Sequence, residues 1–303
     1  MLKDCVLVLG SGKSILNLTK TERELLNTCE VKIGINKFAA FYELAGIEPS
    51  HVYFHDDYDE SSIRMLNYIF KLFRKNKLKK MTFILSENYK GFVFTNYAAF
   101  WINKAFNFFK IFLVHYLVKI GRFTIKKINV DTFNRLNFYI SHSITINPVN
   151  RYNLMSKESK IEFIRIQDSI ARGNKWSKSL VDPLYHFKGS FSTVLNYISI
   201  CYPNKTILLA GVDFNSSDYF FEEELYSLNF NTRDWTYEMS KHHDKHYSII
   251  ETDGNKIDDE LPLILDELKK TDNVVYSLNE LSYLVDEKYI KFVRLVEFLD
   301  NEK

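Results

Sequence analysis

The first ninety residues alternate between short apolar runs and longer amphipathic stretches. The run Cys5-Val6-Leu7-Val8-Leu9 is apolar at every position, which is typical of a strand buried on both faces of a parallel sheet. By the same pattern, strands are expected over 5–9, 31–35, 51–55 and 81–85, and helices over 14–27, 37–44 and 61–74. This alternation predicts an α/β, Rossmann-like fold with a mostly parallel sheet flanked by helices.

The rest of the chain continues the pattern less regularly. Strands are expected over 137–144, 206–210 and 274–278, and helices over 158–171, 191–201, 258–269 and 283–299. Five parts are therefore predicted. Residues 1–90 and 151–214 are the two halves of a nucleotide-binding α/β domain, 91–150 a helical insertion, 215–256 a polar and aromatic lid, and 257–303 a helix–strand–helix unit that closes the sheet.

The insertion has an unusual composition. Residues 88–130 contain no Asp or Glu, seven Lys or Arg, and many aromatic residues. Aromatic side chains beside Lys104, Lys110, Lys119 and Arg122 suit contact with an anionic membrane surface, where a lipid-linked acceptor would lie. An aromatic core helix with solvated lysines is the alternative interpretation.

Composition and charge narrow the class of protein. The formal net charge is +2 and 46% of the residues are hydrophobic, which excludes a disordered chain and gives no support for a nucleic-acid partner. The three cysteines are odd in number and lack metal-ligand spacing, so reduced thiols are expected. A strand begins at residue 5, and no apolar run approaches the roughly 20 residues that span a bilayer. We expect a cytoplasmic protein that can attach peripherally to the inner membrane.

A glycine loop, Gly10-Ser11-Gly12-Lys13-Ser14, follows the first predicted strand. Glycines let a ligand approach the backbone closely, and N–H groups that open a helix favour anions. A P-loop would need glycine in place of Leu7, and a dinucleotide-binding loop would need it in place of Ile15. We expect Gly10, Ser11, Gly12 and Ser14 to bind a nucleotide, with a tight strand-to-helix turn as the alternative.

Three further polar segments follow a predicted strand or open a predicted helix, where ligands of parallel sheets bind. They are Asn36-Lys37, His55-Asp56-Asp57 and Lys188-Gly189-Ser190-Phe191-Ser192. An amide can read a base or a sugar hydroxyl, and a cation with hydroxyls at a helix N-terminus suits an anion. We expect the activated sugar to be bound by Asn36, Lys37, His55, Lys188, Ser190 and Ser192. Helix capping and a solvated acidic turn are the alternatives.

Two residues are candidates for the chemical step. His246 ends the cluster His242-His243-Asp244-Lys245-His246 in the predicted lid, where a base that titrates near neutral pH would be useful. Asp213 follows the strand expected over 206–210. It could act as a nucleophile, and a residue that caps nearby backbone is the alternative interpretation. Adjacent histidines and one acidic turn do not complete a coordination sphere, so no metal site is expected.

Together these segments resemble the bacterial lipooligosaccharide sialyltransferases, which transfer sialic acid from CMP-sialic acid. That family has a Gly-Asn-Gly-Pro-Ser-like loop, matched by Gly10, Gly12 and Ser14, and an Asn-Gln pair, where this chain has Asn36-Lys37. Its Arg-x-Thr-Ser-Gly segment is similar to residues 188–192, with Lys in place of Arg. Its Gly-Ile-Asp-Phe-Tyr segment is similar to 211–215, with Asn in place of Tyr. The similarity does not extend to residues 88–150.

The resemblance implies a metal-independent glycosyltransferase with no cofactor besides its CMP-sugar co-substrate. Tyr219, with Ser190 or Lys188, would bind the leaving phosphate, and His246 would be the general base of an inverting transfer. A retaining transfer through an adduct on Asp213 is the mechanistic alternative. The sugar would be sialic acid, Kdo or a similar acidic sugar, and the acceptor an oligosaccharide or lipopolysaccharide. A homo-oligomer is compatible with the sequence. Rival classes are a non-catalytic nucleotide-binding protein and a phosphotransfer enzyme.

Overall fold

The computed structural model describes residues 2–56, 60–76, 78, 80–91, 93–94, 149–150, 159–167, 175–228, 245–252 and 254–301. The chain divides into two compact units: residues 1–56, 79–87 and 158–303 form the first, and residues 57–78 and 88–157 form the second. Several predicted features lie outside the described residues. They are the strand expected over 137–144, most of the insertion expected over 91–150, Asp57, and residues 242–244 of the histidine cluster.

The second unit is described only in part. It contains α3 (Glu60–Lys75), which agrees with the helix expected over 61–74. It also contains the short strands β5 (Val93–Phe94) and β6 (Val149–Asn150), which pair in parallel. Helix α3 contacts β6 within this unit.

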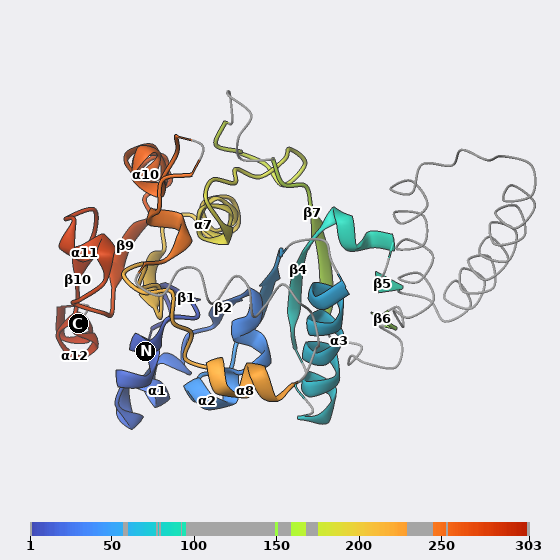
Figure 1. Cartoon of the computed structure of the whole chain (residues 1–303). Helices are drawn as coiled ribbons and strands as arrows, with labels where there is room; N and C mark the ends of the chain where they lie inside the picture. Colours follow the sequence, from blue (N-terminus) through green and yellow to red (C-terminus); the bar gives the residue numbers. More distant parts are fainter. Residues whose placement is uncertain are drawn as a thin grey trace, which may run out of the picture. The chain divides into compact units, whose positions relative to one another are not determined.

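The first unit is built on one sheet of eight parallel strands in the order β10-β9-β8-β1-β2-β3-β4-β7 (Figure 1). The strands are β1 (Cys5–Leu9), β2 (Val31–Ile35), β3 (His51–Phe54), β4 (Thr82–Ser86), β7 (Lys160–Ile164), β8 (Thr206–Ala210), β9 (Val274–Ser277) and β10 (Lys291–Phe292). From β1 the chain moves outward to β7 and then returns to place β8 on the other side of β1. The strand order therefore reverses between β1 and β8. The predicted α/β, Rossmann-like fold is confirmed.

Helices cover both faces of this sheet, with α1 and α2 on one face and α7 and α10 on the other (Figure 1). Right-handed crossovers require this arrangement, because the chain reverses its direction across the sheet after β7. The helices and 3-10 turns are η1 (Lys13–Asn17), α1 (Lys20–Leu26), η2 (Asn36–Ala40), α2 (Tyr42–Ala45), η3 (Glu87–Gly91), α7 (Ser190–Cys201), α8 (Glu222–Ser227), η4 (Tyr247–Ile249), η5 (Ile257–Asp259), α10 (Leu261–Lys269), α11 (Tyr283–Asp286) and α12 (Leu295–Asn301). Among these described helices, none has the length and apolar character needed to cross a bilayer.

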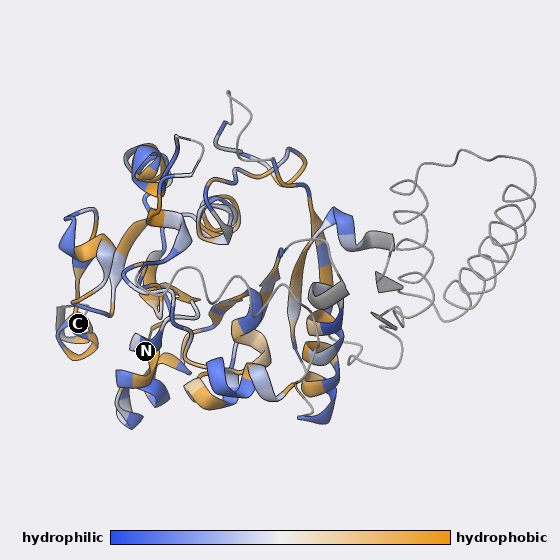
Figure 2. Ribbon diagram, viewed as in Figure 1, coloured by the Kyte–Doolittle hydropathy of each residue, from blue (hydrophilic) through white to orange (hydrophobic). Residues whose placement is uncertain are grey.

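The core lies around β1, β8 and α7. Every residue of β1 is buried, and α7 buries its residues from Phe191 to Ser199. Figure 2 shows hydrophobic residues along the central strands, whereas α1 carries mainly hydrophilic ones. A strand covered on both faces has no polar side, which is why β1 lacks the alternating pattern of a half-exposed strand.

Asn196, a fully buried residue of α7, ties this helix to the preceding segment. Its Oδ1 accepts from the backbone N–H of Tyr185 at 2.8 Å and of Ser177 at 3.3 Å, and its Nδ2 donates to the carbonyl of Ser177 at 2.8 Å. These bonds fix the chain that leads into Lys188, so α7 and the residues before its N-terminus form one rigid piece.

Replacing Asn196 should therefore destabilise the fold strongly. Asn196→Ala leaves several buried backbone groups without a partner, and we expect the free energy of unfolding to fall by about 3 kcal/mol. Urea denaturation measures this loss. Asn196→Asp keeps both acceptor bonds but places a buried carboxylate oxygen opposite the carbonyl of Ser177, so it should also destabilise the fold. Equal stabilities for the alanine variant and the wild type would contradict the role assigned to these bonds.

Two of the expected helices are wrong. Residues 158–171 instead contain β7, the edge strand beside β4, where Lys160 is exposed and the next three residues are half-buried. Polar and apolar positions are mixed there because only part of an edge strand is covered, and its isoleucines favour a strand. Residues 283–299 contain α11, β10 and α12. Lys288, with φ of 62°, is left-handed and cannot continue a helix.

Candidate functional site

Most predicted site residues lie at one edge of the sheet. Parallel strands share a carboxyl edge, and open α/β sheets bind ligands there, next to the point where strand order reverses. This edge also carries unusual backbone conformations. Asn36, Lys188 and Phe214 have φ values of 49°, 51° and 59°. Such left-handed residues cost on the order of 1 kcal/mol and are concentrated at functional sites. We therefore take this edge as the candidate site.

The glycine loop packs directly against the segment that follows β8. The N–H of Gly10 donates to the carbonyl of Ala210 at 2.8 Å, and the N–H of Gly12 donates to the carbonyl of Gly211 at 2.7 Å. A Cβ atom on Gly10 would overlap the carbonyl of Gly211, and one on Gly12 would overlap the carboxylate of Asp213. Both glycines are therefore required by the close approach of the protein's own backbone and carboxylate.

Asp213 occupies the position where the loop would hold an anion. Its carboxylate accepts from the backbone N–H of Ser14 at 3.0 Å and from the hydroxyl of Ser14 at 2.5 Å. A phosphate within about 4 Å of this carboxylate would be repelled by about 4 kcal/mol at an effective dielectric constant of 20. The loop can contact an uncharged part of a nucleotide, but the phosphate has a better place elsewhere along the edge.

Tyr219 and its neighbours lie over the other side of the glycine loop. Tyr219 forms a β-bridge with Gly12, and the N–H of Phe220 donates to the carbonyl of Ser11 at 3.1 Å. Lys13 forms an ion pair with Asp218 at 2.9 Å. The rings of Tyr219 and Phe221 are stacked, with centroids 5.3 Å apart. Tyr219 therefore lies next to the glycine loop, whereas its expected contact with a phosphate stays a prediction. The segment also contains α8, and residues 229–244 of the expected lid lie outside the described residues.

Asn36 connects three segments at the carboxyl edge. Its Oδ1 accepts from the N–H of His55 at 2.9 Å, and its Nδ2 donates to the hydroxyl of Ser190 at 3.0 Å. The hydroxyl of Ser190 also lies 3.3 Å from the carbonyl of His55. The side chain of Lys37 pairs with Asp56 at 3.3 Å. The structure thus brings together residues of three segments that are separate in sequence, namely those with Asn36, His55 and Ser190.

The N-terminus of α7 is the strongest place for an anion at this edge. No acidic residue lies in the first turn of this 12-residue helix, and Gly189 precedes it with φ of 122°. The ammonium group of Lys188 donates to the carbonyl of Thr252 at 3.1 Å. Free N–H groups of a helix N-terminus and a nearby cation both favour a phosphate. Ser192 does not fit the binding role expected for it, because it is fully buried and its hydroxyl bonds to Phe187 and Gly189.

His246 lies beside the segment that follows β8, with its ring 5.2 Å from the ring of Phe214. Its Nδ1 accepts from the backbone N–H of Ser248 at 3.2 Å and caps η4. This bond assigns the proton of the neutral ring to Nε2. Burial lowers the pKa of His246 to about 4, so the ring is neutral at pH 7. In this geometry His246 donates through Nε2, and its one lone pair is already used.

His186 is a further member of this edge that sequence patterns did not single out. Its ring lies 5.1 Å from the ring of His55, edge to face, and its Nδ1 lies 2.7 Å from the hydroxyl of Thr193. Burial, and then the charge of His55, lowers the pKa of His186 to about 4. No motif surrounds His186 in the sequence, and the two rings meet only because the fold places the segment before α7 beside the end of β3.

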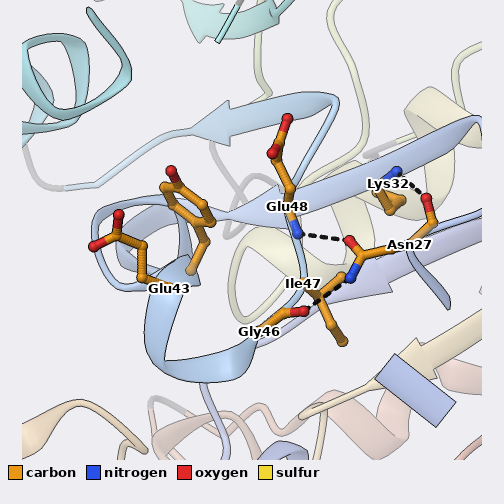
Figure 3. A pocket seen from close by; sticks show the side chains of 7 residues that line it. Asn27, Lys32, Glu43, Gly46, Ile47 and Glu48 are labelled. Carbon is orange, nitrogen blue, oxygen red and sulfur yellow. Dashed lines mark hydrogen bonds between the residues drawn. The ribbon is translucent and has the colours of Figure 1, made fainter. Parts of the chain in front are cut away.

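A pocket of about 440 Å³ lies at the opposite, amino edge of the sheet (Figure 3). Its lining residues are Asn27, Lys32, Tyr42, Glu43, Gly46, Ile47 and Glu48. The ammonium group of Lys32 donates to the carbonyls of Asn27 and Cys29 at 3.0 and 2.8 Å, and the amide of Asn27 bonds to Gly46 and Glu48. These side chains already pair with the protein. The pocket contains none of the predicted site residues.

In the part of the chain that the structure describes, no group of three or more His, Cys, Asp or Glu side chains is placed to hold a metal ion. The three cysteines are all free thiols. Comparisons with protein-family models, with curated proteins and with solved structures gave no match to this chain.

Proposed function

We propose that this protein transfers an acidic sugar of the sialic acid or Kdo type from a CMP-activated precursor to a glycan or glycolipid. One observation carries the proposal. Residues that follow β1, β2, β3 and β8 lie at one sheet edge with residues of η4 and the start of α7, and hydrogen bonds join neighbouring members of this set. In sequence these segments resemble a CMP-sugar site. Open α/β sheets bind their ligands at this edge, next to the reversal of strand order.

The phosphate of the CMP-sugar is assigned to the N-terminus of α7. Lys188 supplies a positive charge there, and Ser190 supplies a hydroxyl that already faces Asn36. The hydroxyl of Ser248 donates to the carbonyl of Lys188 at 2.6 Å, which fixes the backbone just before the helix. The glycine loop would then contact the uncharged nucleoside, since Asp213 excludes a second anion from it.

Transfer requires the bond between the anomeric carbon and the phosphate oxygen to break as the acceptor oxygen bonds to that carbon. CMP leaves with the electron pair, and the acceptor proton passes to solvent. Tyr219 and His246, through its Nε2–H, would stabilise the charge that develops on the phosphate. This role for His246 replaces the general base implied by resemblance, because the bond to Ser248 leaves Nδ1 no lone pair for a proton. It needs no metal.

The acceptor side of this proposal rests on the sequence. The aromatic and basic insertion over residues 91–150 lies almost wholly outside the described residues. Contact of its lysines and arginine with an anionic membrane, and hence a lipopolysaccharide acceptor, remains a prediction. The same holds for a peripheral location at the inner membrane and for a homo-oligomer.

A thermal-shift panel tests the proposed CMP specificity. CMP at 100 times its Kd should stabilise the protein by about 2.7 kcal/mol relative to the ligand-free state. CDP, UDP and ADP at the same concentration should stabilise it less. Lys188→Met should weaken this shift, whereas Lys205→Met, immediately before β8, should leave it unchanged. Release of CMP from CMP-sialic acid or CMP-Kdo with an oligosaccharide acceptor then tests transfer. Stabilisation by ADP with Mg²⁺-dependent turnover of ATP would identify a phosphotransfer enzyme, and CMP binding without turnover a non-catalytic protein.

A further inference from the structure

We propose that Asp213 is a positioning residue that locks the glycine loop to the ends of β8 and β9, and that it is not a nucleophile. The effect on transfer rests on the proposed function, but the lock itself is a property of the ligand-free fold. Three strand ends meet at this carboxylate, two of which are adjacent to the reversal of strand order. The shape of the candidate site therefore depends on it.

Both oxygens of the carboxylate are engaged by the protein. Oδ2 accepts from the N–H of Ser14, while Oδ1 accepts from the hydroxyl of Ser14 and from Nδ2 of Asn279 at 2.9 Å. An ionised carboxylate has about four acceptor positions, so these three bonds use most of them. Asp213 is also only 9% exposed. A nucleophile must present an oxygen to the anomeric carbon, and neither oxygen is presented to a ligand here.

The backbone around Asp213 is held equally firmly. The N–H of Tyr283 donates to the carbonyl of Asp213 at 2.9 Å, and the hydroxyl of Ser282 donates to the carbonyl of Val212 at 3.1 Å. The backbone of Asp213 is therefore held by the start of α11, and its carboxylate points toward the glycine loop. Asn279 is oriented in turn, because its Oδ1 accepts from the N–H of Leu281 at 3.1 Å.

Other residues of the candidate site are attached to the segments on either side of this lock. Phe214, next to Asp213, is left-handed, and its carbonyl accepts from the N–H of His246 at 3.4 Å. On the other side, the locked loop pairs with Tyr219. Movement of the loop would displace the backbone that we assign to the nucleoside, whose contacts are the same before and during transfer. Loss of the lock should thus weaken binding of the CMP-sugar more than it slows the chemical step.

Variants that remove single bonds to the carboxylate test this role. Ser14→Ala and Asn279→Ala should each accelerate amide hydrogen exchange of residues 10–14 about tenfold in the ligand-free protein, which corresponds to the loss of one hydrogen bond. Each should raise the KM for the CMP-sugar about tenfold and change kcat less than threefold. Asn17→Ala, an exposed residue at the end of η1, is the control and should change neither quantity.

Unchanged hydrogen exchange in both variants would overturn the lock, whatever the protein binds. A sugar found covalently attached to Asp213 by intact-protein mass spectrometry, with Asp213→Asn inactive but normal in CMP affinity, would identify a nucleophile instead. If the wild type turns over no CMP-sugar, the proposed function fails. The exchange measurement still decides whether Asp213 locks the loop.

Discussion

His246→Ala should reduce transfer about 10²- to 10³-fold, the effect of removing one hydrogen-bond donor from developing negative charge. The structure commits Nδ1 of His246 to the N–H of Ser248, so only Nε2–H remains to act on a ligand. CMP-sugar turnover under saturating acceptor measures the loss. Binding of CMP should change little, because the charge in question develops as the phosphate leaves.

Two amide variants separate the possible roles of this ring. Glutamine places an N–H near the position of Nε2, whereas asparagine places an oxygen near Nδ1 and can cap η4. We expect His246→Gln to keep most of the activity and His246→Asn to lose as much as the alanine variant. An equal loss of activity in all three variants, together with a wild-type transfer rate that falls as pH drops, would instead identify His246 as a general base. Full activity of His246→Asn would show that the side chain of His246 serves only to cap η4.

The folded protein should lose much of its stability between pH 6.5 and pH 4. Burial lowers the pKa of His51, His186 and His246 to about 4 in each case, whereas the unfolded chain keeps values near 6.5. The unfolded state therefore takes up protons first as pH falls. The stabilisation is complete above pH 6.5, declines toward pH 4 by about 3 kcal/mol for each histidine, and changes no further below it.

Urea denaturation at pH 7.5, 6 and 5 measures this slope, in a window where carboxylates contribute little. His51 provides the control because it lies at the amino end of β3, bonded to Ser50 and Tyr202 and away from the candidate site. His51→Gln should reduce the pH dependence by about a third and leave CMP binding intact. A stability that is constant from pH 7.5 to pH 5 would show that these rings are hydrated.

The sheet could be predicted from sequence where both faces of a strand are covered. β1, β2 and β8 have the expected bounds because buried parallel strands are continuous apolar runs. β7 could not be recognised this way, since an edge strand mixes exposed and half-buried positions. β10 has only two residues and becomes visible only through its pairing with β9.

The shared position of the candidate site residues at one sheet edge could be predicted, but their contacts could not. Glycines 10 and 12 indicated a close approach, yet the approaching groups are the carbonyl of Gly211 and the carboxylate of Asp213, which lies 199 positions from Ser14. No local pattern encodes such a partner. His186 and Asn279 are in the same situation, because strand order alone brings them to the residues that they contact.

The pairing of β1 with β8 has a consequence for the way the chain is made. A ribosome that has released β1 must synthesise about 200 more residues before the strand's second neighbour emerges. Until then one edge of an entirely apolar strand lacks a partner, and unpaired edges of this kind promote aggregation. Contacts so distant in sequence also slow folding. We therefore expect nascent chains that end before residue 206 to need a chaperone, and the proposed nucleotide binding to begin only after the C-terminal third has been added.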